Sequence, residues 1–245
     1  MTALATFGQL SLVAGRALAA LPRLWGRELM RTLSRFGTGS LVIALGVAMA
    51  TGAIIVLETA AYTVSFGARD ILGGMASISI LREFGPLMVA LVMSGWVGAS
   101  NTAELGNLSL GGQVSALRGL GADPYEVLVA PRLLGTVLAM ALIALPADLA
   151  SVMGGVVAAK VVLGVEPAMF IHSIDQWVKL RDVFEGLLKT VCFGAAIGLL
   201  SSRSGLATRG GARAVGRSVA TSVVQSVVAV LILDFAITAL VGGRL

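Results

Sequence analysis

The sequence predicts an all-α polytopic membrane protein, with five transmembrane helices plus an N-terminal interfacial amphipathic helix. Of the 245 residues, 57% are hydrophobic and 13% are charged, whereas about a quarter of the residues in a soluble domain are charged. The mean hydropathy is +0.94, and several apolar stretches are long enough to cross a bilayer as helices. The arginines concentrate in two short segments, which favours cytoplasmic membrane loops over nucleic-acid binding.

Five apolar stretches are each expected to form a transmembrane helix. Their predicted bounds are 40–62, 84–103, 133–159, 187–202 and 219–241. The fourth stretch is short, so its helix must begin in charged sequence or be buried among other helices. Its Gly194 and Gly198 have the spacing that lets neighbouring helices approach closely. The segment Thr63–Ile80 contains three glycines beside Arg69 and Asp70, and we expect an exposed connection with short helical pieces there.

Residues 1–37 are expected to form a helix that lies on the membrane surface. Arg23, Arg27, Arg31 and Arg35 recur every four residues and form one stripe. Apolar and aromatic side chains fall roughly on the opposite face: Trp25, Leu29, Leu33 and Phe36. This pattern is typical of an interfacial helix on an anionic leaflet. The alternative is a solvated helix packed on the rest of the protein, which we predict to be a single transmembrane domain over residues 38–245.

The distribution of charge predicts the orientation of the chain. Five spans place the N-terminal segment, the 104–132 connection and the 203–217 connection on one side of the membrane. That side carries nearly all the unpaired arginine, whereas the opposite connections are close to neutral. Because cytoplasmic loops are enriched in Lys and Arg, we expect a cytoplasmic N-terminus and a C-terminus outside.

Four acidic residues lie within or at the edge of the predicted spans: Glu58, Glu104, Asp148 and Asp234. An ionised side chain at the centre of a membrane helix costs about 2.5–3.5 kcal/mol. These groups should therefore face protein, a watery cavity or a partner, or be protonated. They form either a polar pathway or structural hydrogen bonds between helices; the second interpretation is favoured for Asp148, which lies near Pro146.

The sequence contains none of the common catalytic signatures. It has no G-x-x-x-x-G-K-[ST] loop for nucleotide phosphates, no H-E-x-x-H pair and no G-x-S-x-G turn. One cysteine (Cys192) and one histidine (His172) argue against a His/Cys metal site. We therefore expect no enzyme activity and no cofactor in this chain. If the protein uses ATP, a separate subunit must hydrolyse it.

The connection after the second span is too long for a plain turn. It runs from Glu104 through a glycine-rich polar segment to the turn signal Asp123-Pro124, and then reaches Arg132. We expect a structured hairpin on the membrane surface between two transmembrane helices. This hairpin is the place where a soluble partner could act on the membrane helices.

Several motifs resemble the MlaE/YrbE family of ABC-transporter permeases. They are LREFGPL at Leu81–Leu87, A-E-L-G at Ala103–Gly106 and G-x-D-P at Gly121–Pro124, followed by Pro131-Arg132, the A-D-L around Asp148, Gly154-Gly155, and LDFAITAL at Leu233–Leu240. They keep their order and cover roughly residues 40–240. The resemblance implies a five-span permease with an N-terminal interfacial helix.

The resemblance also implies a function and partners. Such permeases dimerise and sit on a pair of cytoplasmic ABC ATPase subunits, which bind the ATP. They contact a ring of MCE-domain proteins on the outer side, often with a STAS-domain protein on the ATPase. Their cargo is phospholipid or another lipid, moved between the inner and outer membranes. The chain would then lie in the bacterial inner membrane, as one copy of a homodimer or half of a heterodimer.

By this resemblance, residues 104–124 include the coupling helix that docks on the ATPase, with these candidate contacts: Glu104, Gly112, Gln113, Asp123 and Pro124. A lipid cavity at the dimer interface would be lined by the first and fifth spans and by Trp96, with these candidates: Leu57, Glu58, Tyr62, Trp96, Asp234 and Phe235. The chain departs from the family pattern at Trp96, where arginine is common. It departs again at Gly111-Gly112, which replaces a threonine and a glutamate.

Two other functions remain open on the sequence alone. An ion-coupled secondary transporter would use Glu58, Asp148 and Asp234 as proton or ion relays. An intramembrane lipid-modifying enzyme is disfavoured because no acidic or histidine motif is clustered. We favour the lipid permease.

Overall fold

The computed structural model describes residues 26–65 and 67–242, and these residues form helices joined by short connections, with no strand among them. In chain order the elements are α2 (Gly26–Ser65), η2 (Arg69–Ile71), α3 (Leu72–Ser79), η3 (Ile80–Phe84), α4 (Gly85–Met93), η4 (Ser94–Gly98), α5 (Ala99–Leu110), α6 (Gln113–Gly119), η5 (Tyr125–Val129), α7 (Ala130–Leu163), α8 (Pro167–Trp177), α9 (Leu180–Leu206) and α10 (Ala212–Gly242). The all-α prediction is confirmed.

Five helical columns are long and apolar enough to cross a membrane, as the sequence predicts. They span 40–63, 69–110, 125–163, 180–206 and 212–241. Each contains one predicted span, but four of them are clearly longer than predicted. Polar and charged residues occupy their ends, and the hydropathy of the sequence does not mark such turns as helical.

The fourth apolar stretch is short, and the structure shows that its helix begins in the charged sequence before it. The helix α9 begins at Leu180, in charged sequence, and continues for 27 residues. Added Cβ atoms at Gly194 and Gly198 would press against the backbone of α7 at Val137 and Leu133. The close approach expected from the Gly194–Gly198 spacing is therefore present, between α9 and α7.

The expectation of an exposed connection with short helical pieces over Thr63–Ile80 is confirmed in part: η2 and α3 are short helices and Gly67, Arg69 and Asp70 are exposed, but most of α3 is buried. Helix α3 belongs to the second column, and its Leu72, Gly73, Gly74 and Ala76 are buried. A Cβ on Gly73 would overlap the backbone of Phe170 in α8, and the Gly74 N–H donates a hydrogen bond to Ser173 Oγ at 2.9 Å. The glycines allow close helix packing here, which composition alone does not distinguish from a loop.

The predicted interfacial helix falls mostly outside the described residues. Residues 1–25 are not described, and neither are the side chains of residues 26–39. The backbone of α2 is helical from Gly26 without a break into the first span. The orientation of the arginine stripe on a membrane surface therefore stays a prediction.

One apolar core joins all five columns. It combines residues of α2, the α4–η4 segment, α7, α9 and α10: Ala44, Ala48, Val89, Ala90, Met93, Val97, Ala139, Met140, Ile143, Ala147, Phe193, Ile197 and Val230. The proline at position 146 lies within α7, which continues through it. Helices α2 and α7 pack closely at Gly52 and Gly154, because a Cβ on either would overlap the backbone of the other helix.

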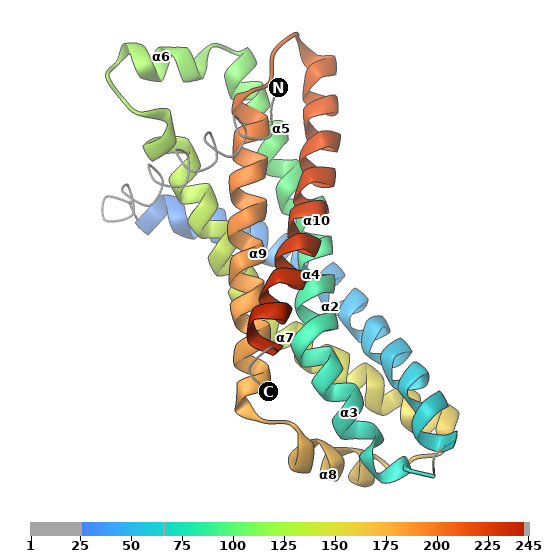
Figure 1. Cartoon of the computed structure of the whole chain (residues 1–245). Helices are drawn as coiled ribbons and strands as arrows, with labels where there is room; N and C mark the ends of the chain where they lie inside the picture. The colour runs from blue at the N-terminus through green and yellow to red at the C-terminus, as the bar shows by residue number, and fades with distance from the viewer. Residues whose placement is uncertain (1–25, 66, 243–245) are drawn as a thin grey trace.

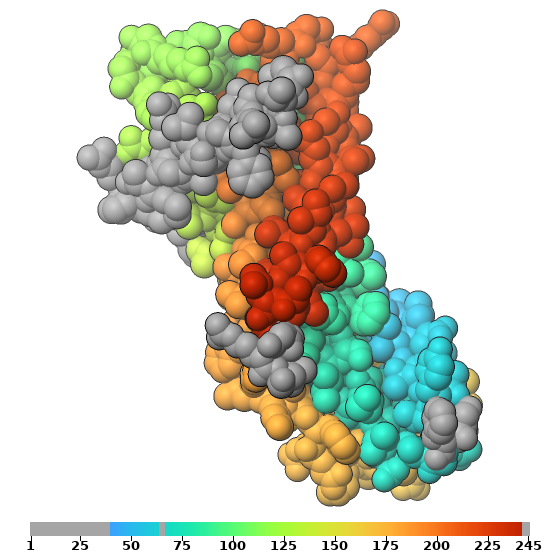
Figure 2. Space-filling model, viewed as in Figure 1, coloured from blue at the N-terminus to red at the C-terminus, as the bar shows by residue number. Residues whose placement is uncertain are grey.

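The bundle has two distinct ends (Figure 1). Helix α6 and the connection between α9 and α10 lie at one end, and α8 lies at the other. The last turns of α2 lie beside α7 and α3, away from α10. Figure 2 shows α10 uncovered along one face of the molecule. Only 11% of the apolar stretch of α10 is buried inside the chain.

Candidate functional site

A turn of π-helix places two charged side chains against the start of α9. This turn, η3, carries Arg82 and Glu83 and is followed by the Gly85-Pro86 start of α4. Single π-helical turns inside helices recur at functional sites, because the extra residue redirects the side chains around it. Gly186 of α9 lets the two backbones meet, since a Cβ there would overlap the carbonyl oxygen of Leu81.

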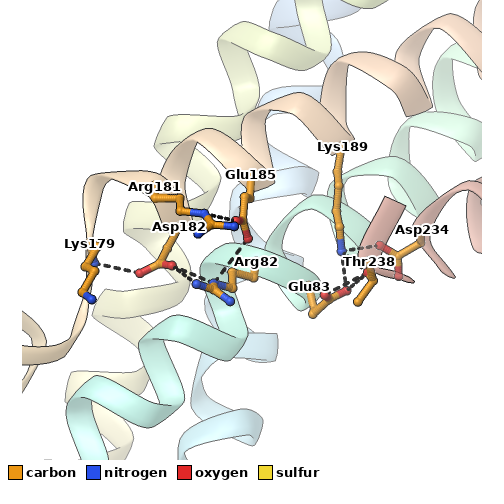
Figure 3. Close-up of polar contacts among 9 residues, drawn as sticks. All are labelled: Arg82, Glu83, Lys179, Arg181, Asp182, Glu185, Lys189, Asp234 and Thr238. Carbon is orange, nitrogen blue, oxygen red and sulfur yellow. Dashed lines mark hydrogen bonds and ion pairs between the residues drawn. The ribbon is translucent and has the colours of Figure 1, made fainter. Parts of the chain in front are cut away.

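The first of two charge clusters is centred on Lys189. Its Nζ lies 2.5 Å from Glu83 Oε2 and 2.9 Å from Asp234 Oδ1, and it donates a hydrogen bond to Thr238 Oγ1 at 2.7 Å. The Thr238 hydroxyl in turn donates to Glu83 Oε1 at 3.0 Å. Only 3% of the Lys189 side chain is exposed. This cluster joins η3, α9 and α10 (Figure 3).

The second cluster joins Arg82 to the first turns of α9. Asp182 Oδ1 accepts a hydrogen bond from Arg82 Nε and lies near Arg82 Nη2, both at 2.6 Å. The other carboxylate oxygen of Asp182 accepts from the backbone N–H of Lys179 at 2.7 Å, which caps the helix. Glu185 lies 3.5 Å from Arg82 and accepts a hydrogen bond from Arg181 at 2.7 Å. Figure 3 shows the two clusters side by side on α9.

The position of the Lys189 cluster makes pairing necessary. Lys189 lies nine residues into α9, which is about 14 Å along the helix at 1.5 Å per residue. At such a depth each unpaired charge would be costly, and removing one member of a buried pair leaves the other uncompensated. A cavity of about 50 Å³ beside the cluster is lined by Glu83, Lys189 and Thr238, among others. It has room for a water molecule but not for a lipid head group.

The structure places one of the six predicted lipid-contacting residues in this network. Asp234 pairs with Lys189, with 16% of its side chain exposed. The other five lie on the surface of the chain: Leu57, Glu58, Tyr62, Trp96 and Phe235. Phe235 is 77% exposed and Tyr62 68% exposed. Because the end of α2 lies away from α10 (Figure 1), one chain does not bring these two residues together.

The predicted coupling residues lie on the hairpin at the α6 end. Gly112 adopts φ 73° and joins α5 to α6, and Gln113 begins α6 on an exposed face. Asp123 is exposed, and its Oδ1 accepts a hydrogen bond from the Tyr125 N–H at 2.9 Å. The ring of the adjacent Pro124 is buried.

Glu104 connects the two long helices at the base of this hairpin. Its Oε1 lies 3.3 Å from Arg132 Nη2, and Arg132 also donates to the carbonyl oxygen of Leu128 at 2.7 Å. The ion pair fixes α5 against the start of α7.

Asp148 occupies the space beside a glycine in the interior of the bundle. It is 6% exposed, and a Cβ on Gly85 would overlap its Oδ1. The carboxyl therefore packs between α7 and the start of α4. This position agrees with the structural interpretation of Asp148 in so far as the group faces another helix and not the lipid.

Sequence reasoning missed the cations and several partners of the two clusters: Arg82, Glu83, Lys189 and Thr238. Lys189 lies only two residues into the predicted fourth span, 187–202, where it resembles an ordinary charge at the end of a membrane helix. Two signals were available. Asp182, Glu185 and Lys189 share one face of a helix, and LREFGPL carries adjacent opposite charges directly before an apolar span.

Comparison with known proteins agrees with this architecture. The family model described as Permease MlaE matches residues 29–240. A "Probable ABC transporter permease protein" of Synechocystis sp. is 32% identical over 209 residues, 85% of this chain and 80% of that protein. One from Rickettsia typhi is 33% identical over 219 residues, 89% and 85% of the two chains.

A plant protein is also similar. The Arabidopsis thaliana "Protein TRIGALACTOSYLDIACYLGLYCEROL 1, chloroplastic" is 28% identical over 212 residues, which cover 86% of this chain and 61% of that protein. The family match extends over all five membrane helices and includes both charge clusters. The chain is therefore a permease subunit, and it belongs to the MlaE permease family.

Proposed function

We propose that this permease moves phospholipid or a related lipid between the inner and outer membranes as part of an MCE-type ABC transporter. Support comes from the family, from relatives named ABC transporter permeases, and from a plant relative named after a galactolipid. The observation that carries the proposal is the exposed apolar surface of the two least buried spans, α2 and α10, in a chain whose family match covers residues 29–240. A lipid requires apolar walls for its acyl chains, and Glu58 on α2 supplies an exposed polar group beside them.

In this proposal the path for the lipid forms between two copies of the chain. Helices α2 and α10 contain the least buried spans: 28% of the apolar stretch of α2 and 11% of that of α10 are buried inside the chain. Leu57, Tyr62 and Phe235 present apolar surface for acyl chains, and Glu58 on the same part of α2 is exposed. These residues become neighbours only if a second permease copy brings its α10 towards α2. Trp96 would line the same chamber.

ATP hydrolysis is assigned to a separate ABC ATPase dimer that docks on α6. The helix is seven residues long, and Val114 is its buried anchor at 7% exposed. A conformational change in the ATPase would displace α6, and the Glu104–Arg132 pair would transmit that movement to α5 and α7. The resulting change in shape of the chamber between the two copies would move the lipid.

The remaining partners follow from the orientation. Arginines 203, 209, 213 and 217 lie at the same end as α6, and positive charge favours the cytoplasmic side. We therefore assign α6 and the N-terminus to the cytoplasm of a bacterial inner membrane. A ring of MCE-domain proteins would meet the α8 end, and a STAS-domain protein would bind the ATPase.

One reconstitution experiment distinguishes the proposal from ion-coupled transport. The permease with its partner ATPase is placed in liposomes that contain a fluorescent phospholipid, and release to acceptor membranes is measured with ATP or with an imposed proton gradient. Dependence on ATP is expected. Transport that follows the proton gradient and ignores ATP would instead support a secondary transporter with Asp148 or Asp234 as relay.

Photocrosslinking tests the location of the lipid path. A photoreactive amino acid at Leu57 or Phe235 is expected to capture lipid more often than the same group at Leu149 of α7, a matched position that is 67% exposed. Equal labelling at all three positions would mean ordinary contact with bulk lipid, and it would exclude a dedicated chamber at these residues.

A further inference from the structure

A second polar pocket lies at the α6 end of the bundle, between the end of α9 and the start of α10. Its volume is about 350 Å³, and its lining combines three arginines with hydroxyl and amide side chains: Arg203, Ser204, Arg209, Arg217, Ser218, Thr221 and Gln225. Two alanines, at positions 207 and 214, complete the walls. None of these residues has a role in the lipid path or in ATPase docking as proposed above.

The charged residues that line this pocket in the described part of the chain are all arginines. Between Glu185 and Asp234 the sequence contains no acidic residue, so neither helix contributes a carboxylate to the pocket. Arg209 and Arg217 are exposed, and Arg203 is partly buried. The exposed guanidinium groups of Arg209 and Arg217 on one concave surface create a positive potential, which favours an anion.

The uncharged side chains of the pocket match a phosphate group. A phosphate has several acceptor oxygens, and arginine binds them in pairs through its planar fork. The hydroxyls of Ser204, Ser218 and Thr221 can donate further hydrogen bonds. Arg217, Ser218, Thr221 and Gln225 lie within two turns of each other along α10, so that the helix presents them on one side.

The connection between the two helices shapes the pocket. Gly210 and Gly211 adopt φ values of 101° and 86°, which side-chain-bearing residues rarely adopt. This turn starts α10 at Ala212 and leaves Arg209 in the pocket lining. The start of α10 adds the partial positive charge of a helix N-terminus nearby.

The pocket is separate from the Lys189 cluster. Arg203 lies 14 residues after Lys189 on the same helix, which corresponds to about 21 Å. The Lys189 cluster therefore lies towards the α8 end of α9, whereas the pocket lies at the α6 end. A ligand in the pocket would contact α9 and α10 at one end while the charge cluster links the same helices further along.

From these observations we infer that the pocket between α9 and α10 binds the phosphate group of an anionic molecule. Two sources share this chemistry: the head group of an anionic phospholipid in the adjoining leaflet, and a soluble phosphate compound. The inference does not depend on which lipid the permease transports. It assigns α9 and α10 a second ligand, whose occupancy would hold these helices together at the α6 end.

A simpler explanation is that the arginines only fix the orientation of the chain, as cytoplasmic arginines commonly do. The chain itself contains the control that separates the two explanations. Arg213 lies in the same segment and is exposed, but it does not line the pocket. Orientation depends on the number of charges, so Arg213 would matter as much as Arg209 or Arg217, whereas a binding site requires the lining arginines.

The test uses the purified full chain in detergent, with binding of phosphatidylglycerol measured by native mass spectrometry and phosphatidylcholine as the zwitterionic comparison. Arg209→Gln with Arg217→Gln is expected to weaken phosphatidylglycerol binding roughly tenfold or more, because charged hydrogen bonds are lost. Arg213→Gln is expected to leave it within about twofold, as befits a residue outside the lining. Ser218→Ala with Thr221→Val removes donors without changing charge and should weaken binding several-fold.

A second arm identifies the source of the phosphate. Inorganic phosphate is titrated into the same variants by calorimetry in lipid-free detergent. Binding of the lipid alone, with the lining variants impaired, assigns a head-group site; binding of inorganic phosphate with the same pattern assigns a soluble ligand. Circular dichroism verifies the helical content of each variant. Equal effects of Arg213→Gln and the double arginine variant, or no effect of either, would overturn the inference.

Discussion

Lys189 of α9 lies 2.9 Å from Asp234 of α10, and both side chains are withdrawn from the surface of a membrane-spanning bundle. The same lysine binds Glu83 of η3, so one cation holds three segments of the chain together. Lys189 offsets one of the two negative charges, and Glu83 keeps 35% of its side chain exposed. This arrangement explains how a permease helix can carry Asp234 within an otherwise apolar stretch.

Replacing Lys189 with methionine should be strongly destabilising. Asp234 would remain largely buried without its cation, and breaking a buried pair costs about 3–5 kcal/mol, whereas the 35% exposed Glu83 would contribute less. Thermal unfolding of the full chain in detergent, followed by circular dichroism, measures the loss. Adding Glu83→Gln and Asp234→Asn to Lys189→Met should recover most of the stability, because no unpaired charge is left.

The matched control for this variant is Arg181→Met, on the same helix. The Arg181 side chain is 55% exposed, and exposed ion pairs contribute little. We expect a change of less than about 1 kcal/mol. If Lys189→Met unfolds at the same temperature as Arg181→Met, the cluster does not stabilise the fold.

The pair of Arg82 and Asp182 should tolerate an exchange of charges better than either single change. Asp182 is almost fully buried, with 2% of its side chain exposed. Arg82→Asp would face Asp182 and Glu185, and Asp182→Arg would face Arg82, so each single variant should lose expression and thermal stability. The double variant restores opposite charges, although Asp182 would no longer cap α9. Partial recovery in the double variant is the result that demonstrates direct pairing.

Close packing of α2 on α7 predicts different effects of the same substitution at two glycines. A Cβ on Gly154 would overlap the carbonyl oxygen of Met49, whereas nothing lies within 4 Å of a Cβ on Gly46. Gly154→Ala should therefore destabilise the chain by about 1–3 kcal/mol. Gly46→Ala should be neutral or slightly stabilising, since alanine favours a helix over glycine by about 1 kcal/mol. Unfolding temperatures of the two variants measure the contrast, and equal temperatures would contradict this packing.

Two acidic residues of the hairpin test the proposed docking on the ATPase. Glu104→Ala removes the pair with Arg132, and Asp123→Ala removes the hydrogen bond to the Tyr125 N–H. Both variants should reduce copurification of the ATPase or its stimulated hydrolysis. Asp123→Asn keeps a side-chain oxygen that can accept from the Tyr125 N–H, and it separates the contribution of the charge from that of the turn.

Asp175→Ala is the control for the docking variants. Asp175 is exposed on α8, at the opposite end of the bundle. It should leave ATPase association unchanged. Normal association and hydrolysis for both Glu104→Ala and Asp123→Ala would contradict the docking assignment.

The sequence predicted the five spans and the hairpin because both depend on local properties. Apolar length decides whether a stretch can cross a bilayer, and the glycines with Asp123-Pro124 mark a turn whatever surrounds them. The same reasoning failed for the burial of α3, at Leu72–Ser79. Glycines in that segment have the composition of a loop, and their role as contact points for α8 depends on where α8 lies.

The candidate site divides in the same way. Asp234 was identified because a single acidic residue within an apolar span can be recognised in the sequence alone. Its partners Lys189 and Glu83 were not, since each looks like an ordinary charge at a helix end until the π-helical turn and Gly186 bring η3 against α9.

Hydropathy and charge spacing by themselves determined that this chain is a helical membrane protein with a polar hairpin on the arginine-rich side. Tertiary structure decided which charges neutralise one another and which arginines share a pocket. The physical reason is that insertion into a membrane depends on the sum of local transfer energies, whereas ion pairing depends on distances of a few ångströms between residues far apart in the chain.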